Sequence, residues 1–122
     1  MYDECIEFIE DEENDFVSVC LYVEDGALAA LGERINAAFE DAYMNGYNWD
    51  ILISAYVRTR NPALANKVER DPEAGLASFS LAYSRENIQV MRSYKVLVHE
   101  LLKDEGALFQ FIRDTEPSID WD

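Results

Sequence analysis

The segment that comes closest to a catalytic motif is His99-Glu100-Leu101-Leu102-Lys103. A zinc-protease helix places a second histidine four residues after the first, so that both imidazoles lie on one helix face and bind the metal. Lys103 occupies that second position, so the sequence excludes this kind of zinc site. His99 is also the only histidine of the chain, which leaves its Ser and Cys residues without the base that nucleophilic catalysis usually needs.

An acidic run at residues 10–15 carries oxygen ligands of the kind that bind calcium. A calcium loop starting at Asp11 needs a glycine at its sixth position and a bidentate acid at its twelfth, where this chain has Phe16 and Tyr22. The sequence also contains no glycine-rich phosphate-binding loop and no Gly-x-Ser-x-Gly turn. We therefore predict no catalytic residue, no cofactor and no metal ion, and we interpret the chain as a non-enzyme.

The charge of the chain indicates the class of its partners. Asp and Glu number 25 against 10 Lys and Arg, giving a formal net charge of −15. Nucleic acids and anionic membrane surfaces are disfavoured as partners because phosphate binding needs clustered cations. The charge is unevenly distributed, with −13 in residues 1–50, +3 in residues 51–103 and −5 in residues 104–122. Such a field steers a basic protein partner, although simple solubility is an alternative explanation.

The elements that position these residues fit a single domain. With 122 residues and 49% hydrophobic residues, the chain is large enough for one core, and we expect one domain over residues 1–122. The N-terminus has no basic or apolar leader, and the apolar stretches are too short to cross a bilayer, which predicts a cytoplasmic protein. The final residues 115–122 contain Pro117, Ile119 and Trp121, and they either dock or form a loose tail.

The N-terminal region predicts a β-hairpin. Residues 4–9 and 16–23 are rich in β-branched and aromatic residues, and the acidic run between them serves as the turn. A turn centred between Glu12 and Glu13 places Cys5 opposite Cys20. We expect two buried thiols in a reducing cytosol rather than a disulfide.

The remaining periodicity predicts helices and one more strand. Apolar spacings of three and four residues indicate a helix from Ala27 to about Tyr43, which Asn45-Gly46 ends with Gly46 in a left-handed cap. A second helix follows from Asn48 as its N-cap to Asn61-Pro62. The further expected elements are a polar connection at 62–75 with a helical turn at 63–67, a strand at 76–83, a long helix after Ser84 and a short helix from Asp104.

The resulting order is ββααβαα. It predicts an α+β fold in which a small antiparallel or mixed sheet, formed by the hairpin and the third strand, is covered on one face by about four helices.

Two segments stand out from the rest of the sequence. Asn45-Gly46-Tyr47-Asn48-Trp49-Asp50 surrounds a helix-to-helix turn with two aromatic residues, and Trp49 is either a core anchor or an interface residue. Asp71-Pro72-Glu73-Ala74-Gly75 is a rigid acidic turn before a strand, and it either fixes the entry of the strand or contacts a partner.

Together with the helix Leu52-Ile53-Ser54-Ala55-Tyr56, these segments resemble the Immunity protein 51 family, small cytoplasmic antidotes encoded beside bacterial polymorphic and contact-dependent toxins. The resemblance covers roughly residues 38 to 110. It implies an α+β fold and a toxin-binding role, but no interface map. The positions that carry the family motif are Asn45, Gly46, Tyr47, Trp49, Asp50, Asp71, Pro72, Glu73 and Gly75.

The charge and the resemblance together yield a hypothesis for the binding surface. Many toxins of this kind are nucleases with basic substrate clefts, which an acidic protein can block. The residues that we expect to face the toxin are Glu10, Asp11, Glu12, Glu13 and Asp15 at the tip of the hairpin, together with Asp71 and Glu73. The alternative is a DNA mimic or adaptor that binds a basic housekeeping protein. The sequence leaves the oligomeric state open.

Overall fold

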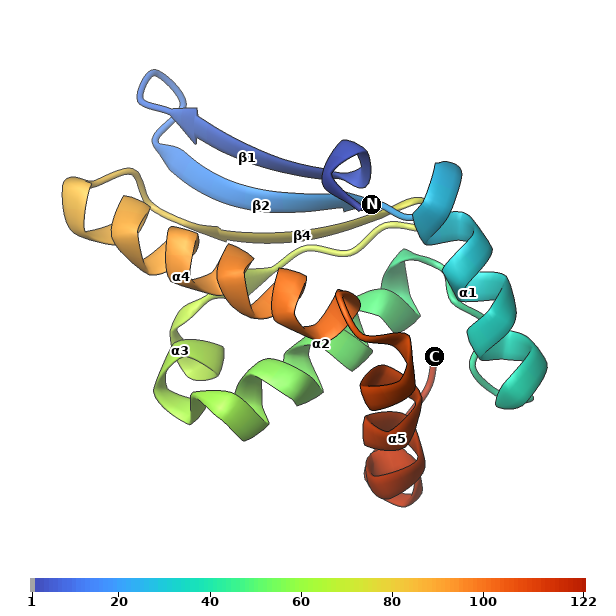
Figure 1. The fold of residues 1–122 in the computed structure, drawn as a ribbon. Helices are drawn as coiled ribbons and strands as arrows, with labels where there is room; N and C mark the ends of the chain where they lie inside the picture. Colours follow the sequence, from blue (N-terminus) through green and yellow to red (C-terminus); the bar gives the residue numbers. More distant parts are fainter. Residues whose placement is uncertain (1) are drawn as a thin grey trace.

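A computed structural model describes residues 2–122, and its centre is a four-stranded antiparallel sheet with the helices on one face (Figure 1). The strands are β1 (Ile6–Asp11), β2 (Phe16–Tyr22), β3 (Glu69–Arg70) and β4 (Leu76–Leu81), in the order β1-β2-β4-β3. This confirms the α+β class, and of the two sheet types expected the antiparallel one is present. The strand that the sequence did not predict, β3, lies in the expected polar connection and has only two residues.

Residues 2–122 contain five α-helices. These are α1 (Gly26–Ala38), α2 (Gly46–Arg60), α3 (Pro62–Lys67), α4 (Arg85–Leu102) and α5 (Glu105–Thr115), with short 3₁₀ turns η1 (Asp3–Cys5) and η2 (Glu116–Ser118). α4 lies across the sheet and contacts β1, β2 and β4, while α2 packs on both α4 and β4. α1 and α5 stand at the end of the sheet nearest the N-terminus (Figure 1).

The alternation of β2 builds the core. Val17, Val19 and Leu21 point to the helix face and are fully buried. On the neighbouring strand β4, the Phe79 ring packs against that of Tyr94 from α4, with 4.9 Å between the ring centroids. All five α-helices and strands β1, β2 and β4 contribute residues to this one hydrophobic cluster. These inward positions alternate because the side chains of a strand have a period of two.

Within residues 2–122, no helix covers the opposite face of the sheet (Figure 1). Its centre holds small side chains, among which the Cys20 thiol lies 3.6 Å from the Ser18 hydroxyl and 3.7 Å from the Ser78 hydroxyl. At its end the hydroxyl of Tyr22 donates a hydrogen bond to the carboxylate of Glu7. This bond raises the pKa of Tyr22 to about 12, and the smaller contributions from burial and from the negative charge of Glu7 act in the same direction.

The expected pairing of Cys5 with Cys20 is wrong. Cys20 lies opposite Glu7, because the turn comprises residues 12–15 and is centred one residue later than expected. Asp15 makes this turn possible by adopting a left-handed conformation, with φ at 59°. Cys5 precedes the strand, in η1, and its thiol donates a hydrogen bond to the carbonyl of Asp25 at 3.4 Å. Both cysteines are buried and free, as expected.

Two helix boundaries also differ from those expected. α1 ends at Ala38 rather than near Tyr43. The side-chain amide of Asn36 donates hydrogen bonds to the carbonyls of Phe39 and Glu40, the two residues that follow the helix. α2 begins at Gly46, because the side chain of Asn45 accepts a hydrogen bond from the backbone N–H of Asn48 at 3.0 Å. Asn45 is therefore the N-cap, and Asn48 belongs to the first turn of the helix.

The C-terminal residues are docked. The backbone N–H of Asp122 donates to the side-chain oxygen of Asn48 at 2.7 Å, and Trp121 packs against the core. Asn48 is fully buried, and its amide N–H donates to the carbonyl of Tyr43 at 2.6 Å. The side chain of Asn48 thus connects α2 both to the segment before this helix and to the C-terminus of the chain. None of the helices between residues 2 and 122 has the length and apolarity that a membrane span requires.

Candidate functional site

The hairpin tip, residues 10–15, is an ordered acidic turn. The carboxylate of Asp11 accepts two hydrogen bonds from Asn14, at 3.0 Å from its backbone N–H and at 2.9 Å from its side-chain amide. These bonds, the side-chain one first, hold the pKa of Asp11 below its usual value. Asp11 is therefore ionised at neutral pH, and the turn has its shape without any partner.

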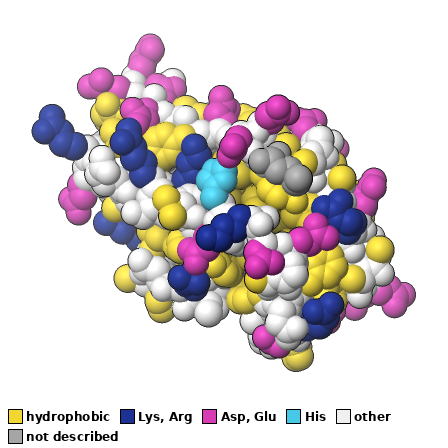
Figure 2. Space-filling view, in the orientation of Figure 1, with side chains coloured by type: hydrophobic (Ala, Val, Ile, Leu, Met, Phe, Trp, Pro, Cys, Tyr) yellow, Lys and Arg dark blue, Asp and Glu magenta, His cyan; other side chains and the backbone are white. Residues whose placement is uncertain are grey.

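Two further tip carboxylates connect the turn to α4 and to the residues just before this helix. Asp15 accepts a hydrogen bond from the backbone N–H of Tyr83 at 3.2 Å, and Glu10 forms an ion pair with Arg92 at 3.2 Å. Glu12 and Glu13 are exposed and have no ion-pair partner among residues 2–122. Figure 2 shows Asp and Glu side chains gathered around this end of the hairpin, at the upper left.

The structure does not bring Asp71 and Glu73 to the hairpin tip. They belong to the turn between β3 and β4, next to Leu76, which pairs with the last residue of β2. The tip lies directly before Phe16, the first residue of β2, and the seven residues of that strand span about 20 Å. The seven residues that the sequence predicted as one toxin-facing set therefore lie at two opposite ends of the sheet.

The two motif segments instead contact each other, and we call residues 45–50 with residues 71–75 the motif junction. The backbone N–H of Gly46 donates to the carbonyl of Ala74 at 2.7 Å. A Cβ atom on Gly46 would lie 1.7 Å from the carbonyl oxygen of Glu73 and 2.5 Å from that of Leu76. The expected left-handed cap is wrong, because the positive-φ glycine in the described chain is Gly26. Glycine is required at position 46 because two backbone segments meet there.

Most other junction residues are also structural. Trp49 is fully buried, which agrees with its interpretation as a core anchor, and its indole lies against Gly32 of α1. Asn45 caps α2, and Gly75 accepts a hydrogen bond from the backbone N–H of Val23 at 3.1 Å. Tyr47 is the exception within residues 45–50 because 38% of it is exposed.

Asp50, the last residue of the first motif segment, forms a buried ion pair. Its two carboxylate oxygens accept hydrogen bonds from Arg70 of β3 at 3.0 and 2.6 Å, and the side chain of Asp50 is only 5% exposed. The pair raises the pKa of Arg70 further above neutrality and ties α2 to β3. Nearby, burial raises the pKa of Tyr94, and the charge of Asp50 adds to this shift. The role of Arg70 was not predictable from the sequence, because a two-residue strand has no readable periodicity.

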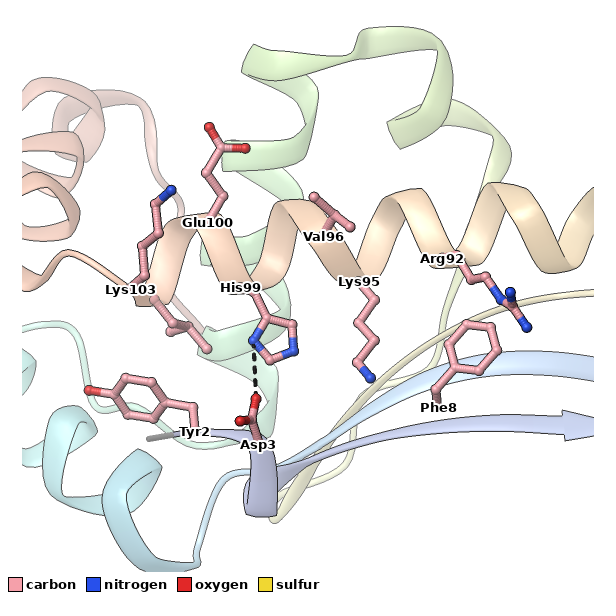
Figure 3. A pocket seen from close by; sticks show the side chains of 10 residues that line it. Tyr2, Asp3, Phe8, Arg92, Lys95, Val96, His99, Glu100 and Lys103 are labelled. Atoms are coloured by element: carbon pink, nitrogen blue, oxygen red, sulfur yellow. Dashed lines mark ion pairs between the residues drawn. The ribbon is translucent and has the colours of Figure 1, made fainter.

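In contrast to the acidic hairpin tip, a groove along α4 is lined by several basic side chains, and we call it the α4 groove. It has a volume of about 900 Å³ and lies between α4 on one side and β1 with η1 on the other (Figure 3). Its lining includes Phe8, Arg92, Lys95, Val96, His99 and Lys103. Figure 2 shows these cations as a band over α4 below the acidic hairpin. This groove was not predicted from the sequence. The available signals were the +3 charge of residues 51–103 and the spacing of three and four residues among the basic side chains at positions 92, 95, 99 and 103.

The described residues offer no group of three or more His, Cys, Asp or Glu side chains arranged to hold a metal ion.

A comparison with protein-family models gives a match to Immunity protein 51 over residues 7–117. The chain belongs to the Immunity protein 51 family. The match includes the hairpin tip, the motif junction and the α4 groove, and it extends the resemblance read from the sequence toward both termini. No curated protein and no solved structure gives a significant match.

Membership in the Immunity protein 51 family indicates toxin neutralisation through a protein partner, and immunity families are generally non-enzymatic. Several residues of the family motif join α2 to β3 and to the β3–β4 turn. The hairpin tip and the α4 groove, which lie outside the junction, are two exposed charged surfaces.

Proposed function

We propose that this chain is an immunity protein that binds a cognate nuclease toxin through the hairpin tip, and that it acts in the cytoplasm of the cell that produces the toxin. The observation that carries the proposal is the ordered turn that presents Glu12 and Glu13 to solvent at one end of the sheet. The chain acts as a binder and catalyses no reaction.

The shape of the tip suits a substrate cleft. A hairpin is two strands wide, with about 4.8 Å between the strands, so its turn can enter a cleft that accommodates a nucleic-acid strand. Carboxylates on the turn then stand near the cations that would otherwise hold phosphates. The turn pays little ordering entropy on binding because Asp11 and Asp15 are already hydrogen-bonded within the protein.

The carboxylates at the other end of the sheet, Asp71 and Glu73, are at most a secondary contact with the toxin. Asp71 and Glu73 would form a second contact only with a toxin that extends along the whole sheet. Their backbone groups already support the motif junction, since the N–H of Glu73 donates to the carbonyl of Leu76 at 2.7 Å. We therefore propose residues 10–15 as the primary contact.

A growth and binding experiment tests the proposal. Cells expressing the toxin encoded beside this gene should survive with the wild-type chain and die with the double variant Glu12→Lys and Glu13→Lys. The purified variant should associate with the toxin more slowly, by tenfold or more at low salt, with a flatter salt dependence.

The matched control is Glu33→Lys with Glu40→Lys, which changes the charge equally at exposed positions in and just after α1. Equal binding by wild type and tip variant would remove the tip from the interface. A chain that neither protects nor binds would favour the alternative of an adaptor for a basic housekeeping protein.

A further inference from the structure

The α4 groove concentrates cations on a chain that has few of them. Of the 10 Lys and Arg residues, Arg92, Lys95 and Lys103 line this groove, and the single histidine lies between them. In Figure 3, the side chain of Lys95 extends from α4 toward β1, that of His99 points toward Asp3 of η1, and that of Lys103 points away from the strand. Lys95 and Lys103 form no ion pair with any residue between 2 and 122.

The acids near the groove are engaged in weak pairs. Glu10 lies 3.2 Å from Arg92 and Asp3 lies 3.7 Å from His99, with Asp3 84% exposed. Glu100 is paired with Arg60 on the side of α2. Exposed pairs of this kind contribute little and exchange readily for another anion. At physiological salt, charges beyond about 8 Å are screened, so the unpaired Lys95 and Lys103 affect a ligand in the groove more than the distant acidic excess does.

The other wall of the groove is an unpaired strand. β1 stands at the edge of the sheet, so its outer N–H and C=O groups have no neighbouring strand. Phe8 points from β1 into the groove, where the guanidinium of Arg92 lies 5.9 Å from the centre of its ring. Glu7 and Asp11 alternate with Phe8 and lie on the opposite, uncovered face of the sheet. A free backbone edge thus runs beside a row of cations.

We propose that the α4 groove binds an extended acidic segment of a partner protein, which pairs with β1 as a fifth strand of the sheet. Side chains alternate between the two faces of a strand, so every second residue of the segment faces α4. Carboxylates at those positions meet Lys95 and Arg92, and Lys103 adds positive charge at the η1 end of the groove. The intervening residues are neutral or basic, because they lie beside Glu7 and Asp11. This proposal goes beyond the function of the hairpin tip and holds whether or not the tip contacts a toxin.

The observations favour this occupant over two others. A second copy of the chain would bring another net charge of −15 and another pair of Glu7 and Asp11 side chains to the same edge. A nucleic acid would meet the cations, but it cannot form a ladder of main-chain hydrogen bonds with β1. An acidic peptide satisfies both the cations and the edge.

A peptide titration followed by amide NMR tests the proposal. The probe is an acetylated and amidated heptapeptide that alternates Glu and Thr, beginning and ending with Glu. It should shift the amide signals of residues 6–11 and 92–103 together, and the outer β1 amides should become protected from exchange. A peptide with Lys in place of Glu should cause no such shifts, and a Glu-Thr peptide with N-methylated amides should lose binding at least tenfold.

Variants separate charge from structure. Lys95→Glu with Lys103→Glu should weaken binding of the Glu-Thr probe at least tenfold, whereas Lys67→Glu with Arg113→Glu changes the net charge equally outside the groove and should leave binding unchanged. Equal binding of the Glu and Lys peptides, equal binding of the N-methylated peptide, or shifts confined to α4 would each overturn the proposal. So would the absence of any shift at millimolar probe.

Discussion

Two acidic turns of similar composition have opposite roles in this molecule. The turn at residues 71–75 lies against the start of α2, where the carbonyl of Ala74 accepts a hydrogen bond from Gly46. The turn at residues 11–15 is stabilised by its own side chains and by one bond to Tyr83, and its central residues are exposed. The backbone of the first turn is therefore part of the fold, whereas the second turn protrudes from it, although both present exposed carboxylates.

The largest effect on stability should come from Gly46→Ala, which disturbs the contact between α2 and the turn at residues 71–75. The added Cβ would lie 1.7 Å from the Glu73 carbonyl oxygen, and since that atom belongs to the backbone, the β3–β4 turn must move away from α2. We expect a loss of about 4 kcal/mol or complete unfolding, measured by urea denaturation.

The control is Gly106→Ala in α5, where the nearest atom to a new Cβ is an Asp104 carboxylate oxygen at an ordinary 3.5 Å. It should change the stability by at most about 1 kcal/mol. A Gly46→Ala variant as stable as this control would show that the junction tolerates separation.

The next effect should come from the ion pair beside the junction. Arg70→Ala leaves the buried carboxylate of Asp50 without its guanidinium, and we expect a loss of about 2–4 kcal/mol in the free energy of unfolding. Arg34→Ala removes the equally short but exposed pair with Glu105 and should have no measurable effect. Equal losses from both variants would contradict the assignment of Asp50 as a buried anchor.

A smaller loss is expected from Asn48→Ala. The substitution removes hydrogen bonds to the backbone of Tyr43 and of Asp122, which should cost about 1–2 kcal/mol. Because Trp121 would leave its packed position, its fluorescence should shift to longer wavelength and the final residues should become sensitive to protease. Unchanged Trp121 fluorescence would mean that the packing of the indole alone holds the tail.

The tip should be almost neutral for stability. Glu12→Lys with Glu13→Lys changes only exposed side chains, so the free energy of unfolding should stay within about 0.5 kcal/mol of the wild type. Thermal and urea denaturation measure this directly. A large loss here would mean that the tip, like the other turn, supports the fold.

The smallest effect concerns Tyr22, which lies at the end of β2 farthest from the tip. Its raised pKa means that the bond to Glu7 contributes fully below pH 10 and is lost as the pH rises through about 12. Absorbance titration of wild type and Tyr22→Phe should differ by one tyrosine that ionises near pH 12. A difference spectrum centred near pH 10 would contradict the hydrogen bond.

The regular elements were predictable from the sequence because their signals are local. The strand within residues 16–23, the helix after Ser84 and the helix from Asp104 each depend on residues within a few positions, and all three are present. The role of Gly46 was not readable because it arises from a carbonyl of Glu73, far along the chain. For the same reason, the sequence indicated the acidity of the tip but not its separation from Asp71.

The sheet order also determines how the chain can fold. β2 pairs with β1 through a short turn, but its second neighbour, β4, is synthesised only after three intervening helices. Until Leu76 pairs with Tyr22, the buried row of Val17, Val19 and Leu21 lies on an exposed edge, the kind of segment that aggregates. The carboxylates that flank this strand repel other chains during that interval. The acidity of the hairpin thus has value before any partner is met, as protection for an early hairpin that waits for the rest of its sheet.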